Sequence, residues 1–85
     1  MDNKQILPKW FKGEIYEEGA VVQNRFSGEE FELTAEELSM YDFVMGATIM
    51  MEMLMGKNKK MVGDLKKGLD WFRENNAKAY MALLD

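Results

Sequence analysis

The sequence predicts an α+β fold in which an N-terminal antiparallel β-hairpin or meander packs on about three helices. Two patterns support this prediction. Residues 11–33 contain short runs of strand-favouring residues separated by turn formers, and residues 34–85 contain the apolar spacing of helices. A chain of 85 residues has room for one hydrophobic core. We therefore expect a single domain over 1–85, with residues 1–9 as a tail.

The strand prediction depends on two turn signals. The Glu-Glu-Gly run at 17–19 can end one strand, and residues 24–29 can join the next two because Gly28 is free to take a positive φ. The result is a meander of two or three strands over about 11–33. Because such a small sheet is barely stable in isolation, its apolar face must pack on a helix.

The first predicted helix begins at a capping box. The Thr34 hydroxyl can accept from the Glu37 backbone N–H, while the Glu37 carboxylate reaches back to Thr34. Beyond this cap, residues 38–55 are almost continuously apolar, and Gly56 supplies a stop. The apolar residues form two stripes, so this helix needs burial on two sides. We expect it to be the central helix of the fold or part of an intermolecular contact.

Two further helices are predicted after a basic link. Residues 58–74 place apolar side chains on one face at i, i+4, i+8 and i+11, namely Met61, Leu65, Leu69 and Phe72. The Asn-Asn pair at 75–76 breaks this pattern. Residues 77–84 then form a last short helix, with Ala79 or Tyr80, Leu83 and Leu84 facing inward.

The composition excludes several kinds of chemistry. The chain has no cysteine and no histidine, which removes disulfides, the usual zinc, copper and haem ligands, and a histidine base for a serine nucleophile. We therefore predict that the protein is not an enzyme and has no catalytic residues, cofactor or metal site. The absence of cysteine and of an apolar leader favours a cytoplasmic location.

Charge argues against membranes and nucleic acid as general partners. The net charge is −4, and residues 1–38 carry nine acidic and four basic side chains. Asp42 and Glu52 interrupt the apolar run of the first helix, so it is too short for a membrane span.

The first helix also carries the predicted partner contact. Six methionines lie between Met40 and Met55, and methionine is over-used on surfaces that accept different partners. Packing filler in the core is the competing interpretation. Asp42 and Glu52 either face solvent or pair with lysines of the second helix, or they mark a polar groove. The residues predicted to contact a partner are Met45, Met50, Met51, Met53, Met55, Asp42 and Glu52.

A lysine cluster follows this helix and supports an alternative function. Its members are Lys57, Lys59, Lys60, Lys66 and Lys67. They could contact phosphates, although lysines at a helix end also interact favourably with the helix dipole without any ligand. Aromatic interleaving and a recognisable nucleic-acid motif are both missing.

Several segments together resemble a protein family. They are Tyr16–Glu29, Phe31–Asp42, Gly68–Asn76, Ala79–Met81 and Leu83–Asp85. In these segments the chain resembles short, uncharacterised proteins encoded by large tailed phages that infect marine cyanobacteria. The resemblance implies only a context, which is an infected bacterial cytoplasm where the protein binds a host or phage protein.

The sequence thus predicts a small non-catalytic protein–protein interaction protein that could form a homodimer. Two alternatives belong to other classes. A nucleic-acid-associated accessory factor would bind DNA or RNA with strong salt dependence. A structural component of a larger assembly, such as a virion, would be found among purified particle proteins.

Overall fold

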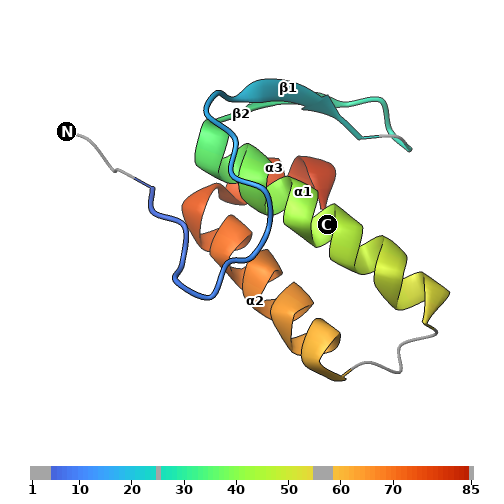
Figure 1. Cartoon of the computed structure of the whole chain (residues 1–85). Coiled ribbons are helices and arrows are strands. Elements are labelled where there is room, and N and C mark those ends of the chain that lie inside the picture. Colours follow the sequence, from blue (N-terminus) through green and yellow to red (C-terminus); the bar gives the residue numbers. More distant parts are fainter. Residues whose placement is uncertain (1–4, 25, 55–58, 85) are drawn as a thin grey trace.

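A two-stranded antiparallel hairpin precedes three helices, so the predicted α+β class is confirmed. The computed structural model describes residues 5–24, 26–54 and 59–84. Figure 1 shows α1 and α2 side by side, with the hairpin lying over the N-terminal part of α1. The elements are β1 (Ala20–Gln23), β2 (Glu30–Leu33), α1 (Ala35–Met53), α2 (Lys59–Asn75) and α3 (Ala77–Leu83).

The sheet has two strands in the described part of the chain, which is the smaller of the two predicted numbers. Its register pairs Ala20 with Leu33 and Val22 with Phe31, so these pairs share one face of the sheet. The connecting turn uses the predicted positive φ of Gly28, which is +79°. The Asn24 side chain also accepts two backbone N–H groups of this turn, at 2.8 and 3.1 Å.

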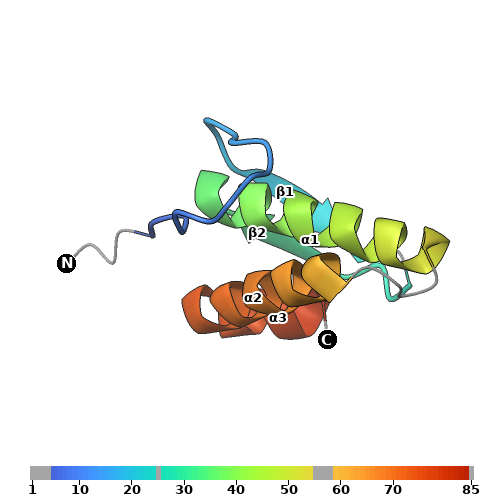
Figure 2. The same ribbon diagram turned by 60° about the horizontal axis from the view of Figure 1, so that its bottom comes forward.

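Residues 5–19 form neither the predicted tail nor a third strand. This segment crosses over α1 before it enters β1 (Figure 2). The Phe11 and Phe43 rings lie 5.4 Å apart, and the indole N–H of Trp71 donates to the Ile6 carbonyl at 3.1 Å. A Cβ at Gly13 would lie 3.1 Å from the Cβ of Phe43. The aromatic residues that favour a strand in sequence are therefore used to pack this segment on the helices, while residues 1–4 lie outside the described part.

Helix α1 begins at the predicted capping box. The Glu37 N–H donates to the Thr34 hydroxyl at 3.2 Å, and the Thr34 N–H donates to the Glu37 carboxylate at 3.0 Å. Its buried apolar residues Met40, Val44 and Ala47 follow one stripe. The other predicted stripe is not covered along the whole helix, so α1 is central at its N-terminal end only.

Helices α2 and α3 complete the core and were both predicted close to their observed bounds. Phe72 of α2 is fully buried. Gly68 lets the helices approach, because a Cβ there would lie 2.9 Å from Cγ2 of Val44. Asn76 caps α3 by accepting from the Ala79 N–H at 3.1 Å. The buried core consists of Leu33, Met40, Val44, Phe72, Ala79, Ala82 and Leu83.

Candidate functional site

The C-terminal half of α1 exposes a group of large apolar side chains. Ile49 is 46% exposed, Met50 45%, Met53 73% and Leu54 40%. Residues three and four apart on a helix are surface neighbours, so these four side chains form one continuous surface. We call Ile49, Met50, Met53 and Leu54 the α1 apolar end. No described residue of α1 beyond Ala47 is buried.

The methionines predicted to contact a partner differ in how far they are exposed. Met50 and Met53 belong to the α1 apolar end, whereas Met45 and Met51 are half-buried. Met55 lies outside the described residues. Met40, which was not among the predicted contacts, is fully buried in the core. Methionine therefore serves as core filler at the start of the helix and as exposed surface near its end.

A hollow of about 350 Å³ lies between α1 and α2, beside the α1 apolar end. Its lining is mainly apolar and includes Met50 of α1 and Met61 of α2. Gly46 leaves space in it, because a Cβ at this position would meet no heavy atom within 4 Å. We call this space, which is lined by Asp42, Phe43, Gly46, Ala47, Met50, Met61 and Asp64, the interhelical hollow.

A second hollow, of about 370 Å³, lies where the hairpin, all three helices and the C-terminal end meet. Phe26 of the hairpin turn and Met45 and Glu52 of α1 are among its lining residues. Asp42 lines the interhelical hollow instead. The structure thus does not bring Asp42 and Glu52 into one polar groove, because each side chain borders a different hollow.

Asp42 has a neighbour that the sequence did not reveal. Partial burial raises the pKa of the Tyr16 phenol above its ordinary value of 10.0, and the negative charges of Asp42 and Glu14 and a hydrogen bond to the Asp42 carboxylate add to this effect. The Tyr16 backbone N–H also donates to the Ser39 hydroxyl at 2.9 Å. Ser39 is fully buried and itself donates to the Ala35 carbonyl at 2.8 Å, so its role is structural.

Glu37 is a buried carboxylate whose wider role sequence reasoning missed. Only 3% of this residue is exposed. Besides the Thr34 N–H, its carboxylate accepts from the side chains of Gln5 at 2.6 Å and Asn76 at 3.0 Å. It therefore joins the N-terminal segment, the start of α1 and the junction between α2 and α3. The capping-box pattern predicted the first partner, but the other two lie 32 and 39 residues away in the chain.

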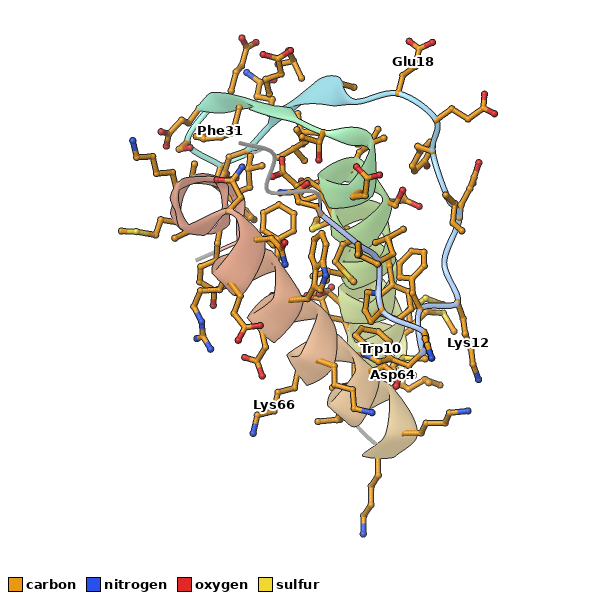
Figure 3. The ribbon with its side chains drawn as sticks, turned by 90° about the vertical axis from the view of Figure 1, so that its left-hand side faces the viewer. Trp10, Lys12, Glu18, Phe31, Asp64 and Lys66 are labelled. Carbon is orange, nitrogen blue, oxygen red and sulfur yellow. The ribbon has the colours of Figure 1, made fainter. Side chains whose placement is uncertain are left out.

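The lysines of α2 are exposed along the helix. Lys59, Lys60, Lys66 and Lys67 are all exposed, while Lys57 lies outside the described residues. Figure 3 shows Lys66 pointing away from α1. The Lys67 ammonium lies 5.8 Å from the centre of the Trp10 ring. One member of the predicted phosphate-binding cluster is therefore engaged within the chain.

Two other features bear on function. Among residues 5–24, 26–54 and 59–84, no group of three or more acidic side chains is arranged to hold a metal ion. No helix in the described part of the chain has the length and hydropathy needed to cross a membrane.

Comparison of the chain with protein-family models, with curated proteins and with solved structures gives no significant match.

Proposed function

We propose that this protein is a small non-catalytic interaction protein that binds another protein through the α1 apolar end. The observation that supports this function is the clustering of four exposed apolar side chains within residues 49–54. Single exposed apolar residues are normal on a protein surface, whereas contiguous groups are typical of interaction sites. Among the residues that the structure describes, the other exposed large apolar side chains belong to several different segments. They are Ile6, Ile15, Val21, Phe26, Val62 and Met81.

The fold explains why the chain does not cover this surface itself. The N-terminal segment and β2 pack on the first half of α1, and Val44 is the last α1 member of the core cluster. The first turn of α2 offers only a half-buried Met61 and an exposed Val62. A partner that buried Met53 would gain up to about 1.5–3 kcal/mol for that side chain. The second half of α1 is thus available to stabilise a complex.

The chemistry of the surface favours a protein partner. Methionine side chains are flexible and polarizable, so Met50 and Met53 can adapt to the shape of an apolar partner surface. We place this interaction in the cytoplasm on the strength of the cysteine-free sequence. The resemblance to phage proteins implies that the partner is a host or phage protein in an infected bacterium.

A second copy of the chain is one partner that can be tested directly. A chain of 85 residues buries a modest fraction of its surface, and self-association is a common way for small proteins to gain stability. Sedimentation velocity at increasing concentration would detect a dimer. A dimer that the double variant Ile49→Glu/Met53→Glu abolishes would identify the partner as a second copy.

A differential capture experiment tests the proposed function in general. Immobilised wild-type protein, the Ile49→Glu/Met53→Glu variant and a Met81→Glu control are compared in the same cell lysate. Met81 is a suitable control because it is 67% exposed, close to the 73% of Met53, but lies on α3. We expect a partner to bind the wild type and the control but not the double variant. The proposal would be contradicted by two results together. The protein would be a monomer in sedimentation, and all three columns would recover the same proteins.

A further inference from the structure

We infer that the interhelical hollow binds a long basic side chain, arginine or lysine, of the partner protein. This inference rests on the proposed function and specifies the chemistry of the partner. The hollow lies next to the α1 apolar end, and Met50 belongs to both surfaces because it is exposed and also lines the hollow. One partner surface can therefore cover both.

The lining of the hollow matches the two parts of a basic side chain. The apolar lining residues offer surface to an aliphatic stem. They are Phe43, Ala47, Met50 and Met61. Asp42 and Asp64 provide two carboxylates for the charged group. A hollow of about 350 Å³ is at the lower end of the size range of ligand pockets, which suits one side chain.

The two carboxylates are not neutralised by ion pairs within the chain. In the described ranges the one ion pair joins Arg73 and Asp70, and it involves neither Asp42 nor Asp64. Asp42 is held by the Tyr16 hydroxyl, which leaves its negative charge in place. Of the two lysines that follow Asp64 on α2, Lys67 lies over the Trp10 ring, and Figure 3 shows Lys66 on the opposite flank of α2 from Asp64.

A metal ion fits this hollow less well than an organic cation. Hard cations take six or more oxygen ligands. The hollow offers two carboxylates, and its other five lining residues have no polar side chain. The described residues contain no cluster of three acidic groups arranged for a metal. Apolar walls with two carboxylates are instead complementary to a cation that carries an aliphatic chain.

Small fragments can test this site without knowledge of the partner. The probe is n-butylguanidinium, and the neutral comparison is n-butylurea, which has nearly the same shape. Each is titrated into ¹⁵N-labelled wild-type protein and followed by backbone amide shifts. We expect n-butylguanidinium to shift the signals of Gly46, Ala47 and Asp64 with saturation. We expect n-butylurea to bind about fivefold more weakly, because it cannot pair with the two partly exposed carboxylates.

Variants locate the binding site. Asp42→Asn/Asp64→Asn should reduce the affinity for n-butylguanidinium to that for n-butylurea. Gly46→Leu should abolish binding, since the new side chain would fill space that is now empty. Gly63→Leu is the matched control, because a Cβ at Gly63 also meets no heavy atom within 4 Å and this residue does not line the hollow. The amide spectrum of each variant reports directly whether it is folded.

Three results would overturn the inference. They are equal binding of the two fragments, undiminished binding of n-butylguanidinium to Gly46→Leu, and the absence of saturable shifts in the wild type. The outcome is independent of the proposed function. Selective binding of n-butylguanidinium would support the assignment of the hollow as a site for a basic side chain, even if no partner were captured. Loss of a captured partner in Ile49→Glu/Met53→Glu would support the proposed function even if the hollow bound neither fragment.

Discussion

Both halves of helix α1 are rich in apolar residues, but the two halves lie in different environments. The first half is covered by the N-terminal segment, β2 and α2, and contains the fully buried Met40 and the nearly fully buried Val44. The second half ends in the exposed Ile49, Met50, Met53 and Leu54. The difference arises because the N-terminal segment and β2 pack on the first half only, whereas α2 lies along both halves but leaves a hollow beside Met50. An apolar helix can therefore be core at one end and a candidate binding surface at the other.

The largest expected effect separates two methionines of the same helix. Met40→Ala should lower the free energy of unfolding by about 2–5 kcal/mol, because it removes a fully buried side chain and leaves a cavity. Met53→Ala, at a residue that is mostly exposed, should change it by less than about 0.5 kcal/mol. Urea unfolding of both variants measures these values. Equal destabilisation would show that the second half of α1 is buried in solution.

A smaller effect tests the polar contacts that hold the covered half together. Glu37→Gln should lower the free energy of unfolding by about 1–3 kcal/mol. The Glu37 carboxylate now accepts hydrogen bonds from Gln5, Thr34 and Asn76. The NH2 group of the new glutamine would face one of these donors, so that one hydrogen bond would be lost. Glu52→Gln, on the exposed part of the same helix, is the control and should have little effect. A Glu37→Gln variant as stable as this control would show that the buried contacts contribute little.

Two glycine-to-alanine variants compare the packing around the two halves of α1. Gly46 lies in the open second half, and Gly68 of α2 lies against Val44 in the first half. Gly46→Ala should raise the free energy of unfolding by about 1 kcal/mol, because the helix gains a better helix former and the methyl group meets no neighbour. Gly68→Ala should lower it, because the methyl group would lie 2.9 Å from Cγ2 of the buried Val44. Thermal unfolding followed by circular dichroism tests both signs. Stabilisation by Gly68→Ala would mean that α1 and α2 are less closely packed.

The smallest effect concerns alkaline pH. Because the pKa of Tyr16 is raised above 10.0 in the folded protein, the folded state keeps a proton that the unfolded state loses. This contribution to stability is complete below about pH 10 and is lost as the pH rises through the folded-state pKa. Tyr16→Phe should therefore make stability decrease less steeply above pH 10. Urea midpoints from pH 8 to about 11 would measure the slope, and identical slopes would contradict the shift.

Much of the fold could be predicted because its signals are local. The capping box at Thr34, the glycine turn at Gly28 and the apolar spacing of α2 each depend on residues close together in sequence. The N-terminal segment could not be predicted in this way. Phe11 and Tyr16 read as strand residues, yet their partners are Phe43 and Ser39, which lie more than 20 residues further along the chain.

The candidate site could be predicted only in part, because the exposure of each side chain depends on contacts between distant segments. The methionine-rich composition indicated that α1 carries more apolar surface than usual, but not which methionines would be exposed. Asp42 and Glu52 appeared equivalent in sequence, whereas the fold assigns them to different hollows. Asp64 was not predicted as a site residue at all, because its proximity to Asp42 depends on how α2 packs against α1.

The amino-acid sequence by itself determined the order and type of the elements, the start of α1 and the excess of apolar side chains on that helix. These properties follow from backbone preferences and hydrogen bonds between near neighbours. Only the tertiary structure decided that the N-terminal segment covers the first half of α1 and leaves the second half exposed. That choice depends on contacts between distant segments, whose geometry no local pattern contains.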